Sequence, residues 1–337
     1  MTTFAEALTA SDPKRPPHLL LGNGFSRALR DDIFAYDALF DRADFAGLSP
    51  EARQSFDVLR TRDFESVMRT LRSAAALLSI YEPGNPGRAQ RLRADADALR
   101  DLLVRTIASN HPDRPGEIAL EAYAACRAFL ANFDHIYTLN YDLLLYWALM
   151  QQELEPKVAF DDGFRTPDEG PEDYVTWDVE KTDQQNVFYL HGALHIFDAG
   201  AEIQKYTWIN TGVPLIDQIR EALERNFYPL FVAEGESDGK LARIRHSDFL
   251  ARAYRSFAKI GGSLFIYGHS MAPNDEHIVR LIGKSRIRQL FIGLYGDPES
   301  PDNRRIRTRA GALAASRARS RPLEVVFFDA GSVRVWG

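Results

Sequence analysis

Residues 17–26 read PHLLLGNGFS, and this stretch decides the fold. The apolar run Pro17–Leu21 is typical of a strand buried on both faces of a parallel sheet. The turn after it carries glycine at positions 22 and 24, so the backbone can approach a pyrophosphate, and Ser26 stands where a helix begins. The third glycine of the dinucleotide-binding fingerprint is missing. On its own, the turn therefore fits a nucleotide-binding loop and a plain strand-to-helix turn equally well.

Six further apolar runs end in small or polar residues, as the first one does. They span residues 135–138, 187–190, 230–232, 263–267, 289–294 and 323–328. Apolar residues at spacings of three and four predict amphipathic helices around 143–148 and 249–257. Strands alternating with helices predict an α/β fold with a doubly wound, Rossmann-like parallel sheet of about six to seven strands.

More than a hundred residues separate the first two predicted strands. Apolar stripes at 64–78 and 99–107 predict helices there, so we expect a large helical insertion after the first strand. We assign residues 31–132 to this insertion, with a turn at Pro83–Gly87, and residues 1–30 and 133–337 to a Rossmann-like core. The acidic, turn-rich stretch Asp161–Gln185 is predicted to be a mobile loop over a site.

The composition excludes several classes of protein. Of the 337 residues, 45% are hydrophobic and 26% charged, so the chain can fill a core without a disulfide or a metal. The single cysteine, Cys126, excludes an internal disulfide, a zinc ribbon and a thiol-ligated iron–sulfur cluster. The net charge of -6 disfavours nucleic acid and anionic membranes as partners. We recognise no signal peptide and no membrane-spanning apolar stretch, and therefore expect a cytoplasmic protein.

Polar residues follow three of the other predicted strands, at the edge where parallel sheets bind ligands. These residues are Asn140 and Asp142 after the second strand, His191 and Gly192 after the third, and Gly268, His269 and Ser270 after the fifth. Each has two interpretations. Asn140 or Asp142 is either a helix N-cap or a ligand-orienting group. His191 is either a structural histidine or a proton-transfer group.

In their order along the chain, these segments resemble the motifs of the sirtuin-like superfamily of NAD-consuming proteins. In that superfamily a GAGxS-type turn holds the diphosphate, a TxNxD segment meets the nicotinamide ribose, an HG histidine is the general base, and a GxS turn takes the far phosphate and the adenosine ribose. The resemblance implies that the core binds NAD⁺ as a substrate, without a metal. It implies His191, Asn140 and Asp142 as catalytic residues, and as NAD⁺-binding residues Gly22, Asn23, Gly24, Phe25, Ser26, Gly192, Gly268, His269 and Ser270.

Two departures narrow the resemblance. The first turn reads GNG, which places Asn23 where alanine is usual. Deacetylase sirtuins carry a four-cysteine zinc module after the histidine, and one cysteine cannot supply it. The chain therefore looks closest to a bacterial branch without zinc, whose members are typically NAD hydrolases and in several cases anti-phage effectors.

This branch implies cleavage of the nicotinamide N-glycosidic bond, which gives nicotinamide and ADP-ribose. Asn140 would orient a ribose hydroxyl or the attacking water, His191 would accept a proton, and Asp142 would hold the carboxamide or the local loop. One alternative is a non-catalytic sensor of NAD⁺ or ADP-ribose. Another is a protein deacylase or ADP-ribosyltransferase, which the missing zinc module disfavours. A homo-oligomer or a partner protein is the expected trigger.

Three further features have a structural and a functional interpretation. The basic tract Arg304–Arg321 is predicted to be a solvated amphipathic helix rather than a phosphate-binding or partner-binding patch. Residues 234–240 are predicted to be a flexible surface loop rather than one that brings Lys240 to a phosphate. Glu65 is a first-turn helix acid, and the resemblance also allows it to face the nucleotide. His246, His269 and His277 show no ligand-like pattern, so we predict no metal site.

Overall fold

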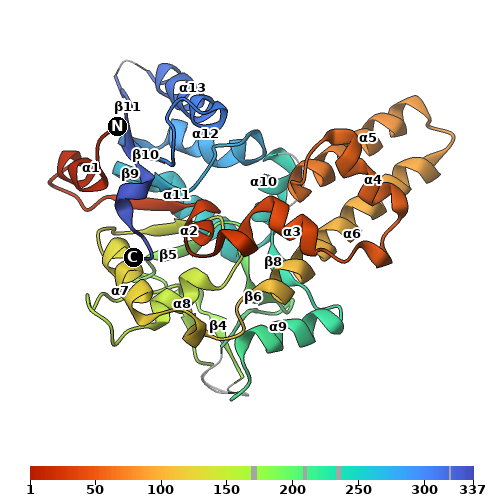
Figure 1. The fold of residues 1–337 in the computed structure, drawn as a ribbon, viewed down its shortest axis with the longest axis horizontal. Coiled ribbons are helices and arrows are strands. Elements are labelled where there is room, and N and C mark those ends of the chain that lie inside the picture. Colours follow the sequence, from red (N-terminus) through yellow and green to blue (C-terminus); the bar gives the residue numbers. More distant parts are fainter. Residues whose placement is uncertain (168–172, 208–210, 233–236, 319) are drawn as a thin grey trace.

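Six parallel strands form the central sheet of the protein, in the order β11-β10-β9-β1-β2-β5 (Figure 1). The structure is a computed structural model, and it describes residues 1–167, 173–207, 211–232, 237–318 and 320–337. The strands are β1 (His18–Leu21), β2 (Ile136–Thr138), β5 (Val187–Tyr189), β9 (Gly261–Tyr267), β10 (Arg286–Leu294) and β11 (Glu324–Asp329). Counted within this sheet alone, their order is 3-2-1-4-5-6, as in dinucleotide-binding Rossmann folds. The predicted doubly wound α/β sheet is confirmed.

Side chains of the central strands alternate between two apolar cores, one on each face of the sheet. In β1, Leu19 and Leu21 enter one core and Leu20 enters the other. The second core is covered by α11 (Asp248–Lys259), α12 (Glu276–Lys284) and α13 (Pro301–Ala315). The first is covered by α1 (Phe4–Ala10), α2 (Gly24–Phe34), α7 (Leu120–Leu130) and α8 (Leu144–Met150). Covering both faces explains why the strands read as continuous apolar runs.

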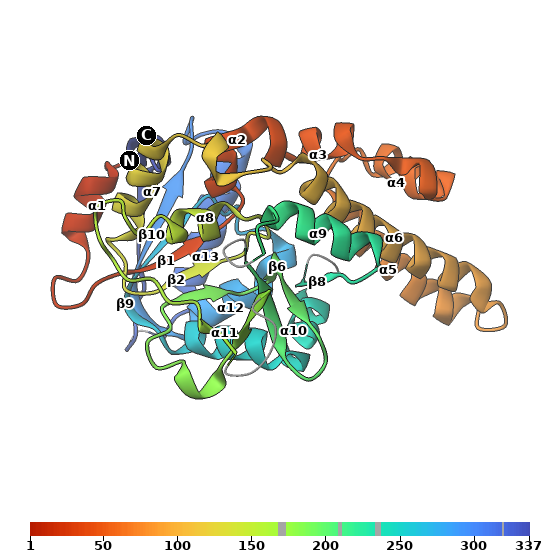
Figure 2. The ribbon, with the colours of Figure 1, turned by 90° about the horizontal axis from the view of Figure 1, so that it is seen from below.

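The chain between β1 and β2 forms only helices. After α2 come α3 (Tyr36–Arg42), α4 (Pro50–Leu59), α5 (Phe64–Tyr81) and α6 (Pro86–Asn110), followed by α7. Helices α4, α5 and α6 extend to one side of the sheet (Figures 1 and 2). Both predicted apolar stripes lie in helices, the first in α5 and the second in α6. The division of the chain into a core and a separate helical module stays a prediction.

A second, antiparallel sheet is formed by segments between β2 and β9, on both sides of β5 in the chain, and the sequence did not predict it. Its order is β3-β4-β7-β6-β8, and its strands are β3 (Phe164–Arg165), β4 (Tyr174–Trp177), β6 (Gly192–Asp198), β7 (Ile203–Tyr206) and β8 (Pro229–Phe231). The predicted fourth strand, 230–232, therefore belongs largely to β8 and not to the parallel sheet. The stretch 161–185 was expected to be a loop, yet it contains β3 and β4. Residues 168–172 of this stretch lie outside the described residues.

Two more helices and several short 3-10 helices complete the described structure. Helix α9 (Leu215–Glu224) packs on β6 and β7, and α10 (Ser237–His246) packs on α11. The 3-10 helices are η1 (Phe45–Gly47), η2 (Pro115–Glu117), η3 (Val179–Lys181), η4 (Pro273–Asp275) and η5 (Ala330–Val333). No helix in the described ranges is long and apolar enough to cross a membrane.

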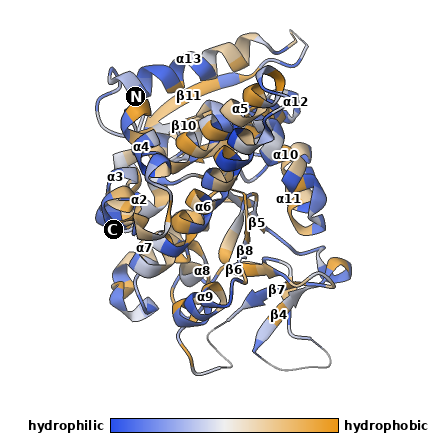
Figure 3. Ribbon diagram, turned by 90° about the vertical axis from the view of Figure 1, so that its right-hand side faces the viewer, coloured by the Kyte–Doolittle hydropathy of each residue, from blue (hydrophilic) through white to orange (hydrophobic). Residues whose placement is uncertain are grey.

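The predicted helix in the basic tract is confirmed up to Ala315, where α13 (Pro301–Ala315) ends, whereas Arg317 and Arg321 lie beyond it. Arg304, Arg305 and Arg307 are exposed, whereas Ile306 and Ala310 are buried against the sheet. The hydropathy colouring of Figure 3 shows this hydrophilic outer surface along α13. Arg319, also part of the predicted tract, lies outside the described residues.

The turns after β1 and β9 touch backbone to backbone. The Gly24 N–H donates to Gly268 O at 2.8 Å, and the Gly22 N–H donates to Tyr267 O at 2.9 Å. A Cβ at Gly24 would lie 2.5 Å from Gly268 Cα, and one at Gly268 would lie 2.6 Å from Gly24 Cα. Gly268 also has a φ of +70°, which side chains rarely adopt. This contact therefore requires glycine on both sides.

We expect Gly268→Ala to destabilise the protein more than Gly296→Ala does. Gly296 has a similar φ of +72°, but a Cβ there meets no described atom within 4 Å. The control should therefore lose about 1–2 kcal/mol of unfolding free energy from the left-handed backbone alone. Gly268→Ala should lose a further ~1–3 kcal/mol from overpacking. Denaturant unfolding of both variants measures the difference, and equal losses would contradict the role given to this contact.

Candidate functional site

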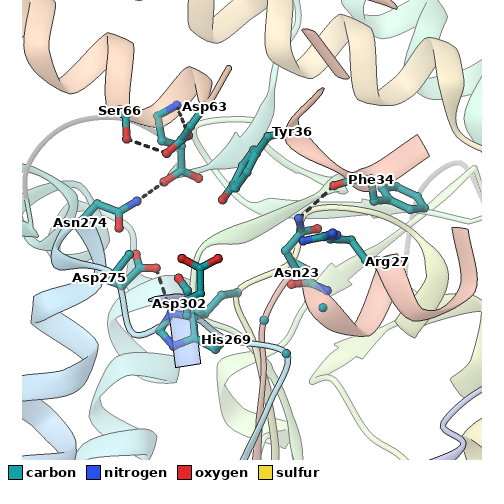
Figure 4. Close-up of a pocket in the computed structure, with 18 of the residues that line it drawn as sticks. Asn23, Arg27, Phe34, Tyr36, Asp63, Ser66, His269, Asn274, Asp275 and Asp302 are labelled. Atoms are coloured by element: carbon teal, nitrogen blue, oxygen red, sulfur yellow. Dashed lines mark hydrogen bonds and ion pairs between the residues drawn. The ribbon is translucent and has the colours of Figure 1, made fainter. Parts of the chain in front are cut away.

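A pocket of about 840 Å³ opens at the carboxyl ends of the central strands, beside the switch point between β1 and β9 (Figure 4). Ligands of open α/β sheets bind at this place. Helices α2, α3, α5 and α6 contribute the opposite wall. Nine of the residues that the sequence singles out line the pocket: Gly22, Asn23, Gly24, Asn140, Asp142, His191, Gly268, His269 and Ser270.

Three residues of the predicted site do not line the pocket. Phe25 is buried and packs on Trp336, with ring centroids 4.9 Å apart. Ser26 is fully buried behind Asn140 and Asp142. Gly192 has a φ of +78°, and a Cβ there would lie 1.8 Å from Leu230 O, so this glycine allows the chain to turn into β6. The structure gives these three residues packing and positioning roles.

The glycine turn meets the pocket with part of its backbone already engaged. The Gly24 N–H donates to the β9 turn, the Phe25 N–H to Gly22 O and the Ser26 N–H to Asn23 O. The space that Gly22 and Gly24 leave is filled by the turn at Gly268 and His269. The primary role of Gly22 and Gly24 is therefore to let the turn after β1 pack against the turn after β9. The Asn23 side chain donates to Phe34 O at 3.0 Å and connects the two ends of α2 (Figure 4).

Asn140 and Asp142 share a buried network with Ser26. The Asn140 Nδ2 donates to Ser26 Oγ at 2.9 Å, and the Ser26 hydroxyl donates to Asp142 Oδ2 at 2.5 Å. The other carboxylate oxygen of Asp142 accepts from the Leu144 N–H at 2.9 Å, at the start of α8. Burial raises the pKa of Asp142, while these donors oppose the shift. Asp142 thus stabilises the helix start and lines the pocket at once.

His191 lies at the end of β5 and is almost completely buried. Its Nε2 is 3.0 Å from Nε2 of His277, so one ring donates a hydrogen bond and the other accepts it. The same nitrogen is 3.9 Å from Asp275 Oδ1. Burial, with a contribution from the nearby Lys240 charge, holds the pKa of His191 well below its usual value. The imidazole is therefore neutral near pH 7 and can accept or donate a proton within this pair.

A buried charge network closes one side of the pocket. The Lys240 ammonium donates to Glu65 Oε2 at 2.8 Å and to Asp275 Oδ1 at 3.1 Å, and its side chain is 1% exposed. Burial favours neutral Lys240, but the two carboxylates outweigh it and raise its pKa. The prediction of a flexible surface loop is wrong for Lys240, because α10 carries it into the core. Residues 233–236 lie outside the described structure.

Glu65 joins this network to the helical segment and lines the pocket. It accepts hydrogen bonds from Tyr141 Oη at 3.2 Å and from Asn274 Nδ2 at 2.7 Å. Burial raises the pKa of its carboxyl, with the Lys240 charge opposing. Asp275 also accepts from His269 Nε2 at 3.0 Å (Figure 4). The sequence marks Glu65 and Lys240 separately but does not indicate that they pair with each other.

Three residues beside the pocket have the geometry of a metal site but already hold a cation. Ligand atoms of His191, Asp275 and His277 lie within 4.8 Å of one another. The Lys240 ammonium is 3.1 Å from Asp275 Oδ1, so the carboxylate of this cluster already pairs with a cation. We therefore interpret this cluster as a proton and charge network.

Comparison with known proteins gives one assignment. No curated protein matches the chain. A family model described as "Domain of unknown function (DUF4917)" matches residues 19–336, which is nearly the whole chain. The match begins in β1 and ends at Trp336, so it includes the parallel sheet, the helices between β1 and β2, the antiparallel sheet and every residue of the pocket network. The chain belongs to the DUF4917 family.

Proposed function

We propose that this protein hydrolyses NAD⁺ at the bond between nicotinamide and ribose. One observation carries the proposal: a pocket at the switch point of a 3-2-1-4-5-6 sheet receives Asn140 and Asp142 after β2 and His191 after β5. This edge is the dinucleotide site of such sheets. The order of the motifs, which resembles that of sirtuin-like proteins, supports NAD⁺ as the substrate.

The proposed reaction needs no oxidant and no second substrate except water. The bond between C1′ of the ribose and N1 of nicotinamide breaks, and its electron pair neutralises the pyridinium nitrogen. A water oxygen bonds to the oxocarbenium-like C1′ and loses one proton. The products are nicotinamide, ADP-ribose and a proton. As the nicotinamide becomes neutral, the positive charge moves to the ribose, and oriented polar groups in the site can stabilise it there.

The pocket residues have distinct roles in this proposal. Asn140 presents an amide that can orient a ribose hydroxyl or the attacking water. His191 accepts the proton of that group, and its contact with His277 offers the next position for it. Asp142 is buried and fixed by Ser26 and the start of α8, so it positions the loop that carries Asn140.

Cations on the helical wall suit the diphosphate. Arg27 of α2 and Arg69 of α5 both line the pocket. Arg27 pairs with Asp31, whereas the Arg69 guanidinium has no hydrogen bond or ion pair to any residue that the structure describes. An arginine without a partner at a pocket wall is suited to bind a phosphate. The acidic lining, which includes Asp63 and Asp302, suits the pyridinium end instead.

The chain after His191 favours hydrolysis over protein deacylation. The resemblance would place a four-cysteine zinc module there in a deacetylase. Here β6 begins directly at Gly192 and joins an antiparallel sheet. The single cysteine, Cys126, is buried in α7.

A non-catalytic sensor of NAD⁺ or ADP-ribose is the second candidate. It is favoured because the polar atoms of the predicted catalytic residues already have internal partners: Ser26 for Asn140 and Asp142, and His277 for His191. A site with satisfied groups can bind a nucleotide without turning it over. Binding of ADP-ribose without release of nicotinamide from NAD⁺ would favour this candidate.

We expect the purified protein to release nicotinamide from NAD⁺, and His191→Ala and Asn140→Ala each to reduce the rate by about 100-fold or more. Chromatography of the products measures the rate, and circular dichroism checks that each variant is folded. His246→Gln is the matched control, because His246 is exposed on α10 and bonds only to Ala242 O among the described residues. Wild-type rates in either alanine variant would refute these roles.

We also expect Arg69→Gln to weaken binding of NAD⁺ and ADP-ribose by about tenfold, because it removes a charge-assisted phosphate contact. Arg93→Gln is the control, since Arg93 is exposed on α6 and bonds to Ser79. Calorimetric titration with ADP-ribose measures the affinity of both variants. An unchanged affinity in Arg69→Gln would show that the diphosphate does not reach this wall.

The biological part of the proposal rests on the resemblance alone. We propose that the protein acts as an anti-phage effector whose trigger is oligomerisation or a partner protein. Deletion of the gene should then reduce protection against phage infection. Unchanged protection would contradict this role. It would not bear on NAD⁺ hydrolysis, which the nicotinamide-release experiment tests separately.

A further inference from the structure

Three metal-ligating side chains meet at the edge of the sheet opposite the pocket. His18 begins β1, and Asp134 and His135 directly precede β2, so all three lie at the amino ends of neighbouring parallel strands. The Asp134 Oδ2 accepts a hydrogen bond from His135 Nδ1 at 2.6 Å and lies 3.7 Å from His18 Nδ1. The three ligand atoms all lie within 4.8 Å of one another.

The backbone holds these side chains in place. The Asp134 N–H donates to Pro17 O at 2.9 Å, and the Leu19 N–H donates to His135 O at 2.9 Å. These bonds continue the ladder in which Leu19 pairs with Ile136. The sheet therefore brings the three residues together before any ion is bound, which lowers the cost of binding. An ion would replace the hydrogen bond between His135 and Asp134.

His18 provides an observation independent of the clustering. Its Nδ1 is buried and has no hydrogen-bond partner in the described structure, although the residue is only 8% exposed. The His18 ring lies edge-on to the ring of His135, with centroids 5.1 Å apart. His18 Nδ1, buried without a hydrogen-bond partner and 3.7 Å from Asp134 Oδ2, is therefore available as a metal ligand.

We propose that His18 Nδ1, His135 Nδ1 and Asp134 Oδ2 bind one divalent transition-metal ion of the Zn²⁺ type. Two imidazoles and one carboxylate suit such ions, whereas Mg²⁺ and Ca²⁺ prefer all-oxygen sites. The Asp134 and His135 side chains are 47% and 32% exposed, which leaves a path for the ion and room for water as a further ligand.

This site is independent of the proposed NAD⁺ chemistry. The ion would join the first residue of β1 to the residues before β2, at the far end of the strands from the pocket. Because it binds only the folded arrangement, it would stabilise the native state. The cluster at His191 differs, because its carboxylate, Asp275, already pairs with the Lys240 ammonium.

Calorimetric titration of the tag-free, chelator-treated protein with ZnCl₂ tests the proposal. We expect one ion per chain, a higher Tm with Zn²⁺, and an affinity at least about tenfold lower in Asp134→Asn and in His135→Gln. Both side chains are partly exposed, so these variants should fold, which a melting curve without metal confirms. His246→Gln is the control for a histidine outside the cluster and should bind as the wild type does.

Two outcomes would overturn the proposal. One is the absence of Zn²⁺ binding by the wild-type protein. The other is binding that survives in Asp134→Asn and His135→Gln. A third variant, His277→Gln, locates the ion in that case, because loss of binding there alone would place it beside His191.

Discussion

The contact between the turns after β1 and β9 is the constraint on which the site depends. Gly24 and Gly268 meet so closely that neither has room for a Cβ. This contact holds the carboxyl ends of the two central strands together, at the point where the strand order reverses direction. The start of α2 is fixed by the same contact, because the Gly24 N–H donates across it. The position of the two turns therefore sets one side of the pocket, and the start of α2 sets where the helices on the other side lie.

The dual roles of the pocket residues explain why their sequence patterns were ambiguous. Asp142 was weighed as a helix cap and as a ligand-binding group, and the structure places it at a helix start and in the pocket wall. His191 is buried in a histidine pair and also lines the pocket. The structural interpretation and the functional one therefore do not exclude each other at these positions. A substrate that binds these side chains would have to replace the hydrogen bonds that they already make with other residues of the protein.

The parallel sheet was predictable because strands buried on both faces leave continuous apolar runs, and because their carboxyl ends gather polar residues at one edge. The antiparallel sheet was not predictable, because β3 and β8 are only two and three residues long. Runs this short do not indicate whether a strand pairs in parallel or antiparallel. For this reason the prediction that the strand at 230–232 belongs to the parallel sheet is wrong. The Lys240 network escaped prediction for another reason: Glu65 lies 175 residues away in the chain, and only the fold brings the two together.

The buried Lys240 also constrains how this family can diverge. Its ammonium is shared between Glu65 of α5 and Asp275 of η4, and almost no water reaches it. Removing one partner leaves a buried charge without compensation, which is far more costly than replacing the whole set by apolar residues. The three positions are therefore energetically coupled. In relatives, we expect these three positions to change together. A relative without lysine at position 240 should therefore also lack the carboxylates at positions 65 and 275.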